Sequence, residues 1–278
     1  MNGQIIRIIS NLYTVKCDDE IYGCRARGKF RNEGISPLVG DNVVIDINDN
    51  VITQILHRKN ELSRPMIANV DKAFIIASVK RPELDLYLLD KLITIITYND
   101  IEPVIIFTKL DLLSKEELDN VDRYKLYYNS IGIKCLYNSE TEDIKKIIND
   151  SIVVLAGQTG SGKSSLLNRL DSNFKIKTDD ISEALGRGKH TTRHVELYKI
   201  GTGYVADTPG FSSLDLNIPK EELKFNFKEF DNYECKYRDC LHNKEAGCKV
   251  KEAVDNNDIL KSRYDNYILF LKENERWK

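Results

Sequence analysis

The chain has 278 residues and a mass of 32.0 kDa, enough for one large domain or for two or three small ones with a buried core. Its formal net charge is −2 and 30% of its residues are charged, so overall charge does not indicate a nucleic-acid-binding protein and any basic surface must be local. No stretch approaches the roughly 18 uncharged apolar residues of a transmembrane helix, and the first residues lack the apolar core of a signal peptide. We therefore expect a soluble, cytoplasmic protein that does not act at a membrane.

Residues 1–65 have the pattern of a small β-barrel. Short runs rich in Ile, Val and Tyr alternate with turn residues, as in strands joined by tight connections. The predicted strands are residues 4–9, 12–17, 21–27, 42–47 and 51–56. Five short strands in so short a segment are typical of an OB-type barrel.

Basic residues gather on and just after the third predicted strand, with Phe30 among them. They are Arg25, Arg27, Lys29 and Arg31. On an OB barrel, a basic and aromatic strand face is a frequent nucleic-acid-binding surface. We interpret these residues as a candidate RNA-binding surface, with an ordinary solvated charge run as the alternative.

Residues 66–220 alternate between apolar strands and amphipathic helices, which is typical of a parallel sheet covered on both faces. The predicted strands are residues 73–79, 104–107, 133–137 and 152–156, followed by a pair at 195–200 and 204–206. Asp85 is the predicted N-cap of one helix, and Ser114 and Glu117 form a capping box at the start of another. The fold class is therefore α/β.

A complete phosphate-binding loop of the G-x-x-x-x-G-K-S type lies between a predicted strand and a predicted helix. It consists of Gly157, Gln158, Thr159, Gly160, Ser161, Gly162, Lys163, Ser164 and Ser165. Its glycines allow backbone N–H groups to turn towards phosphate oxygens, and the helix directs its positive N-terminus at the same anion. We predict that Lys163 contacts the β- and γ-phosphates and that Ser164 binds Mg²⁺.

A guanine-reading T-K-x-D motif follows the predicted strand 104–107, where parallel sheets bind ligands. The motif consists of Thr108, Lys109, Leu110 and Asp111. The Asp111 carboxylate can accept hydrogen bonds from two adjacent N–H groups of guanine, a pair that adenine lacks, while the stem of Lys109 packs along the ring. Asn138 and Ser139, after the next strand, could add backbone contacts to the base.

The order of these motifs is inverted relative to an ordinary GTPase, in which the guanine motif comes last. Here the guanine motif precedes the phosphate loop, and a D-x-x-G motif follows at residues 207–210. The inversion predicts a circularly permuted GTPase core.

Two further groups are predicted to complete the Mg²⁺ and γ-phosphate site. Asp207 would reach Mg²⁺ through water, and the N–H of Gly210 would meet the γ-phosphate. Upstream, Thr192 rather than Thr191 would supply a second hydroxyl ligand to Mg²⁺.

The residue that orients the attacking water is not the usual one. Phe211 follows the D-x-x-G motif, where many GTPases have Gln, and a phenyl ring cannot position water. His190 is the candidate catalytic residue because imidazole has a near-neutral pKa and two nitrogens, and His194 is a weaker candidate. A solvent-facing loop histidine is the competing interpretation of His190.

Four potential metal ligands lie within 14 residues of the segment 221–278, which apolar residues at helical spacing predict to be a small helical domain. They are Cys235, Cys240, His242 and Cys248. Such crowding favours metal binding over a disulfide framework. Four N and S ligands fill a tetrahedral Zn²⁺ shell and leave no position for catalytic water, so we predict one structural zinc ion per chain.

Together, the barrel, the motifs and their order resemble the circularly permuted, ribosome small-subunit-dependent GTPase family called RsgA (YjeQ/YloQ-like), over essentially the whole chain. The resemblance implies a GTPase that acts late in 30S subunit maturation, binds 16S rRNA through its barrel and zinc domains, and hydrolyses GTP faster on the subunit. The family's proposed catalytic histidine corresponds to His190. Gly160 stands where potassium-activated GTPases carry Asn, so bound K⁺ is not expected. A monomer is expected, with domains at 1–65, 66–220 and 221–278.

Two other functional classes fit parts of the sequence. One is a kinase or ATPase that uses the phosphate loop on a small substrate, although no insertion provides an acceptor pocket and lid. The other is an RNA-binding module with a vestigial nucleotide site, although every expected phosphate and Mg²⁺ contact is present.

Overall fold

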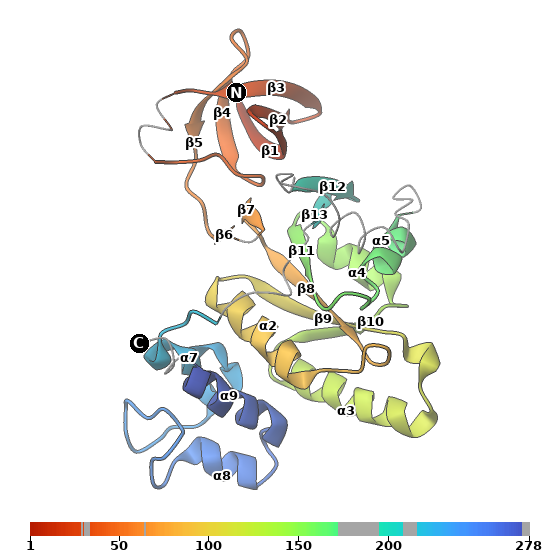
Figure 1. Ribbon diagram of the computed structural model, residues 1–278, viewed down its shortest axis with the longest axis vertical. Helices are drawn as coiled ribbons and strands as arrows, with labels where there is room; N and C mark the ends of the chain where they lie inside the picture. The colour runs from red at the N-terminus through yellow and green to blue at the C-terminus, as the bar shows by residue number, and fades with distance from the viewer. Residues whose placement is uncertain (29, 31–33, 64, 172–194, 208–215, 274–278) are drawn as a thin grey trace.

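The computed structural model describes the chain except for residues 29, 31–33, 64, 172–194, 208–215 and 274–278. Three parts follow one another down the long axis of the molecule: a barrel, a sheet covered by helices, and a helical C-terminal part (Figure 1). Among the described helices, none combines the length and the apolar character needed to span a membrane.

The N-terminal part is the predicted five-stranded barrel. Its strands are β1 (Asn2–Ile9), β2 (Leu12–Cys17), β3 (Glu20–Ala26), β4 (Asn42–Asp46) and β5 (Val51–Ile55). They follow the order β1-β2-β3-β5-β4, and pairing of β1 with β4 closes the barrel. Inward-facing side chains such as Ile5, Val15 and Ile52 are fully buried. The alternating pattern in the sequence locates each strand to within two residues at either end.

A short hairpin follows the barrel and lies outside the predicted elements. It consists of β6 (Glu61–Ser63) and β7 (Met66–Ala68). Strands of three residues are too short to show a periodic pattern, which explains why the sequence does not indicate them. Ile67 of β7 is fully buried and bridges to Val39.

The central sheet has the order β10-β9-β8-β11-β13-β12. Its strands are β8 (Lys72–Ser78), β9 (Glu102–Thr108), β10 (Lys134–Tyr137), β11 (Ile152–Ala156), β12 (Glu196–Ile200) and β13 (Gly203–Asp207). All pairings are parallel except the β12–β13 hairpin. The carboxyl ends of β8, β9, β11 and β13 therefore meet at one edge of the sheet, where α/β sheets bind ligands.

Helices cover both faces of this sheet (Figure 1). On one face lie α2 (Leu86–Tyr98) and α3 (Lys115–Ser130), and on the other lie α4 (Thr141–Ile148) and α5 (Lys163–Leu170). Asp85 caps α2 by accepting a hydrogen bond from the Leu88 N–H at 3.0 Å, and the predicted capping box of Ser114 and Glu117 starts α3. These predictions of helix starts are confirmed.

The C-terminal part packs a small aromatic core against α2. Its helices are α7 (Lys220–Leu223), η3 (Lys224–Asn226), η4 (Lys228–Asn232), α8 (Lys249–Asp255) and α9 (Lys261–Glu273). Phe227 contacts Phe230 and Tyr267 with ring centroids 5.2 and 5.0 Å apart, and Ile95 of α2 belongs to the same buried cluster. The helical character predicted for this segment is confirmed.

A buried charged cluster joins this C-terminal part to α2. Arg263 of α9 has no exposed surface; its guanidinium donates to Asp90 of α2 at 2.8 Å and also to Glu229. Tyr128 of α3 and Asn266 of α9 each donate to Asp90 at 2.7 Å. Burial opposes the charge on Arg263, but the two carboxylates raise the pKa of Arg263 above its usual value. The cluster therefore joins four elements that are far apart in sequence, namely α2, α3, η4 and α9.

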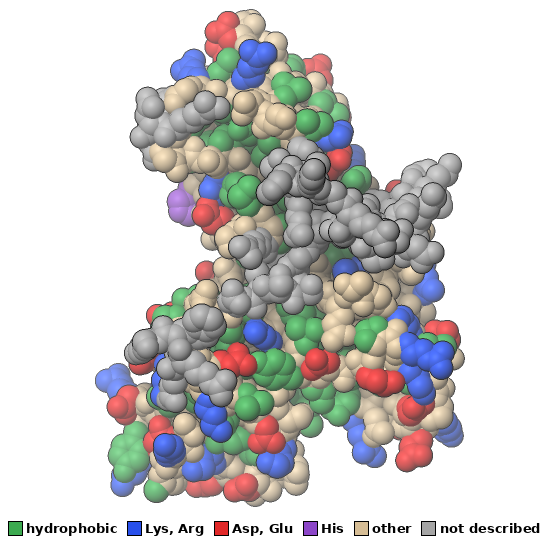
Figure 2. All heavy atoms as spheres, viewed as in Figure 1, with side chains coloured by type: hydrophobic (Ala, Val, Ile, Leu, Met, Phe, Trp, Pro, Cys, Tyr) green, Lys and Arg blue, Asp and Glu red, His purple; other side chains and the backbone are tan. Residues whose placement is uncertain are grey.

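The barrel and the central sheet are also joined, because β1 pairs with β12 and makes one continuous sheet of eleven strands. On the face shown in Figure 2, basic and acidic side chains are interspersed over the C-terminal part. This mixture agrees with the small net charge of the chain.

Candidate nucleotide and metal sites

The phosphate loop connects β11 to α5 and depends on glycine at defined positions. Gly157, Gly160 and Gly162 have φ of 130°, 76° and 99°, the left-handed region that favours glycine. A Cβ atom at Gly157 would lie 2.5 Å from the carbonyl oxygen of Ile76 on β8. The loop therefore passes so close to the neighbouring strand that a residue with a side chain would clash at position 157.

Lys163, the first residue of α5, folds back over the loop. Its Nζ donates to the carbonyl oxygens of Gly157 at 2.8 Å and Gln158 at 2.6 Å. Burial lowers the pKa of Lys163 to about 8. Ser164 is buried beside it in the first turn of the helix, where a hydroxyl can meet a cation held by phosphate.

The guanine motif and the phosphate loop meet directly. Thr108, the last residue of β9, donates its hydroxyl to the carbonyl oxygen of Ser161 at 2.6 Å, and both residues are buried. The sequence places these residues 53 positions apart, and the parallel pairing of β8 with β9 and β11 brings them together. A guanine base recognised next to Thr108 would therefore lie beside the phosphates bound by the loop.

The other residues of the guanine motif lie just past the end of β9. Lys109 has a left-handed backbone with φ of 64°, and its ammonium group donates to the carbonyl oxygen of Arg81. Asp111 lies in the short helix η1 (Leu110–Leu112) and is exposed. Its carboxylate is therefore accessible to a ligand at the sheet edge.

Asn138 follows β10 at the same edge. Its N–H donates to Phe107 of β9 at 2.9 Å, and its carbonyl oxygen accepts from Arg169 of α5 at 3.0 Å. The backbone polar groups of Asn138 are thus already paired within the protein. The contacts of the 138–139 segment with a base stay a prediction.

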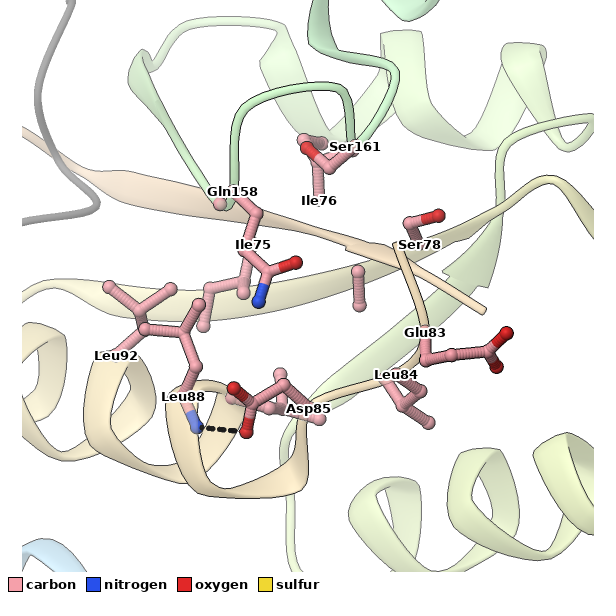
Figure 3. A pocket seen from close by; sticks show the side chains of 13 residues that line it. Ile75, Ile76, Ser78, Glu83, Leu84, Asp85, Leu88, Leu92, Gln158 and Ser161 are labelled. Atoms are coloured by element: carbon pink, nitrogen blue, oxygen red, sulfur yellow. Dashed lines mark hydrogen bonds between the residues drawn. The ribbon is translucent and has the colours of Figure 1, made fainter. Parts of the chain in front are cut away.

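A hollow lies next to the phosphate loop, between the end of β8 and the start of α2 (Figure 3). Leu88 and Leu92 of α2 line it on one side, and Gln158 and Ser161 of the loop line it on the other. The Ser161 hydroxyl is buried and has no hydrogen-bond partner among the described residues. The sequence does not reveal this feature, because it depends on how the loop packs against β8.

Several predicted site residues lie outside the described part of the chain. They are Lys29, Arg31, His190, Thr191, Thr192, His194, Thr208, Pro209, Gly210 and Phe211. Asp207 is the last residue of β13, where its Cα is aligned with that of Glu196. Arg25 and Arg27 are exposed at the end of β3.

The four predicted zinc ligands form one cluster. The candidate ligand atoms of Cys235, Cys240, His242 and Cys248 all lie within 4.8 Å of one another. The sulfurs of Cys235 and Cys248 are 3.8 Å apart, and Nδ1 of His242 lies 3.5 and 3.4 Å from them. A tetrahedral Zn²⁺ with Zn–S bonds of about 2.3 Å would separate its sulfurs by about 3.8 Å, so the spacing fits this metal.

The ionisation of two of the four groups, Cys235 and His242, also suits a metal, whereas burial raises the pKa of both Cys240 and Cys248. Burial opposes ionisation of Cys235, but backbone N–H groups of Val250 and Lys249 lower its pKa overall, which favours the thiolate. Burial lowers the pKa of His242 and favours the neutral imidazole that metals bind. The backbone N–H of His242 donates to the sulfur of Cys240 at 3.4 Å, which fixes the direction of that ligand.

Comparison with known proteins agrees with this geometry. Residues 55–217 match the RsgA GTPase family, and residues 2–55 match the RsgA N-terminal domain. A protein of Oceanobacillus iheyensis named small ribosomal subunit biogenesis GTPase RsgA 2 is 46% identical over 98% of this chain and 96% of its own length. A Clostridium botulinum protein named small ribosomal subunit biogenesis GTPase RsgA is 45% identical over 98% and 97%.

Two solved structures have the same architecture over the whole chain. The crystal structure of YjeQ from Thermotoga maritima superposes with a TM-score of 0.86 at 34% identity, covering 100% of this chain and 99% of that one. The structure of YloQ, described as a circularly permuted GTPase, gives 0.85 at 36% identity and covers 100% and 96%. The predicted permuted fold is thus confirmed.

Proposed function

The chain belongs to the RsgA GTPase family and is a GTP hydrolase, and on this premise we propose that it acts on the small ribosomal subunit late in 30S maturation, with GTP hydrolysis stimulated by the subunit. Both relatives described above are named as GTPases of small ribosomal subunit biogenesis. Family membership also argues against the alternative of a small-substrate kinase. The protein binds GTP and GDP in this proposal.

The observation that carries the nucleotide part is the hydrogen bond from Thr108 to Ser161. It holds the guanine motif and the phosphate loop in one site. In our proposal Asp111 accepts the guanine N–H pair, Lys109 leaves Arg81 to lie along the base, and Lys163 leaves its carbonyl partners to bind phosphate. The whole loop from Gly157 to Ser165 contributes backbone N–H groups.

For hydrolysis, we assign Mg²⁺ to the hydroxyls of Ser164 and Thr192 and, through water, to Asp207. In this proposal the N–H of Gly210 would contact the γ-phosphate. His190 orients the attacking water, since Phe211 has no group that can do so. Mg²⁺ would neutralise phosphate charge during transfer.

We propose that the chain divides into three domains at 1–65, 66–220 and 221–278, of which the second is the GTPase core. Arg25, Arg27, Lys29 and Arg31 on the first are proposed to contact 16S rRNA. Zn²⁺ on Cys235, Cys240, His242 and Cys248 would stabilise the third, because closed N/S sites contribute folding free energy directly. The protein acts as a cytoplasmic monomer in this proposal.

The guanine assignment is tested by Asp111→Asn. The amide replaces one acceptor by a donor, which mismatches guanine and matches the carbonyl of xanthine. Preference should shift from GTP towards xanthosine triphosphate by a factor of about 5–150, as expected for a mismatched bidentate pair of about 1–3 kcal/mol. Competition binding with both nucleotides measures the shift, Asp119→Asn on α3 is the matched control, and an unchanged preference would refute the assignment.

A further inference from the structure

The loop that joins β8 to α2, residues 79–85, lies beside the guanine motif at the edge of the central sheet. The N–H of Val79 donates to the carbonyl oxygen of Thr108 at 3.2 Å. Two residues later, the carbonyl oxygen of Arg81 accepts from the ammonium group of Lys109. The loop therefore contacts the first two residues of the guanine motif in chain order.

Between these two contacts, Lys80 binds helix α3, which follows the motif in the chain. Its Nζ lies 2.8 and 3.0 Å from the two carboxylate oxygens of Glu117. The same carboxylate accepts from the backbone N–H of Ser114 at 2.7 Å, in the capping box that starts α3. Lys80 and the Ser114 N–H lower the pKa of Glu117 to about 2, so this carboxylate is charged near neutral pH. The ion pair therefore connects the loop to the start of α3.

Asp111 lies in η1, between two parts of the chain that are held in place. On one side, Thr108 is hydrogen-bonded to the loop and to Ser161. On the other side, the start of α3 is held by the pair of Lys80 and Glu117. Among the described residues, none donates to the Asp111 carboxylate, so both of its oxygens are free to accept the two N–H groups of guanine.

We propose that Lys80 and Glu117 are positioning residues for guanine recognition, because their ion pair fixes η1 so that the Asp111 carboxylate meets both N–H groups of the base. This inference rests on the proposed function, since it requires that Asp111 recognises guanine. The pair is partly exposed, with 28% and 46% of the two side chains accessible, so its loss should change overall stability little. Guanine recognition should change more, because two hydrogen bonds to one carboxylate require that it is correctly oriented.

Comparison of GDP with inosine diphosphate tests the proposal. Inosine diphosphate keeps the phosphates, the ribose and one base N–H group but lacks the exocyclic amino group, so it loses one of the two hydrogen bonds to Asp111. The readout is the Kd for inosine diphosphate divided by the Kd for GDP, both measured by calorimetry without hydrolysis. In Lys80→Met and in Glu117→Gln this ratio should fall about two- to fivefold below the wild-type ratio. Glu117→Gln keeps the start of α3 intact, because glutamine also forms a capping box.

The matched control is Glu116→Gln at the neighbouring exposed position of α3, which should keep the wild-type ratio. Lys80→Arg keeps the positive charge and should keep the ratio as well. The double variant Lys80→Met/Glu117→Gln should lose no more than either single variant, because both changes remove the same interaction. Thermal unfolding of every variant is measured alongside.

Four results would overturn the proposal. The first is a wild-type ratio in both Lys80→Met and Glu117→Gln. The second is an equal loss of affinity for the two nucleotides, which is what a purely structural role of the pair predicts. The others are a double variant whose loss is the product of the two single losses, and a Lys80→Arg variant that loses as much as Lys80→Met.

Failure of the proposed function gives a different pattern. If Asp111→Asn leaves the ratio at its wild-type value, the guanine assignment fails and the inference falls with it. If Asp111→Asn lowers the ratio and the Lys80 and Glu117 variants do not, only the inference fails. The response to small subunits affects neither outcome, because the measurement uses neither subunits nor hydrolysis.

Discussion

At the scale of single residues, two lysines of the nucleotide site are already hydrogen-bonded within the protein, and a bound nucleotide must replace these hydrogen bonds. Lys163 and Lys109 both donate to backbone carbonyl oxygens, and each would exchange that partner for a nucleotide. The sequence predicts the roles of these residues, because the motifs specify which chemical groups meet phosphate and base. It does not predict the Thr108 to Ser161 hydrogen bond, or that the Ser161 hydroxyl lacks a partner among the described residues, because both depend on packing between strands.

The lowered pKa of Lys163 leads to a prediction about proton uptake. Burial lowers this pKa to about 8, so at pH 8.5 the free protein holds much of this amine uncharged. Phosphate favours the charged form and raises the pKa, so GTP binding at pH 8.5 should take up protons and affinity should fall as pH rises above 8.

Calorimetry in buffers of different ionisation enthalpy measures this uptake. At pH 7, where Lys163 is already charged, little uptake should be seen, which makes that pH the matched control. A binding enthalpy independent of the buffer at pH 8.5 would contradict the prediction.

At the scale of elements, helix α2 connects the nucleotide site to the C-terminal part. Leu88 and Leu92 face the hollow beside the phosphate loop, while Asp90 binds Arg263 of α9. Helical spacing in the sequence predicts α2 and α9 separately. It does not show that Arg263 is buried or which residues it pairs with. Asp90 lies 173 positions from Arg263, and only the packing of the two helices brings them together.

Loss of this buried guanidinium should destabilise the protein strongly. Arg263→Met leaves the carboxylates of Asp90 and Glu229 buried and uncompensated, at a cost of about 3–5 kcal/mol in the free energy of unfolding. Denaturant unfolding measures this loss. The control Lys261→Met, at an exposed position of the same helix, should change stability by less than about 0.5 kcal/mol, and equal effects of the two variants would argue against the cluster.

The metal cluster makes a second prediction at this scale. Cys240→Ser should abolish stoichiometric zinc, measured by elemental analysis, and should lower the protease resistance of residues 221–278, because closed zinc sites contribute directly to folding. Cys135→Ser, at a buried cysteine of β10 outside the cluster, should keep its zinc. Wild-type protein purified without metal but with an intact C-terminal part would refute a structural role.

At the scale of the whole molecule, the permuted order of motifs determines which parts lie next to the nucleotide site. Alternating apolar residues predict the barrel strands, and motif order predicts the permuted core, because both signals are local in sequence. The junction of β1 with β12 could not be predicted, since it joins residues 189 positions apart, Arg7 and Glu196, without a local signal. It places the barrel directly against the hairpin that ends in Asp207.

The central claim is a GTPase that responds to the small ribosomal subunit, and the most direct test is the rate of GTP hydrolysis with and without purified 30S subunits. Large subunits serve as the control partner, and Lys163→Ala serves as the control protein. We predict that 30S subunits, and not large subunits, accelerate the wild type, and that Lys163→Ala stays inactive under every condition. Equal wild-type rates with and without 30S subunits would contradict the account.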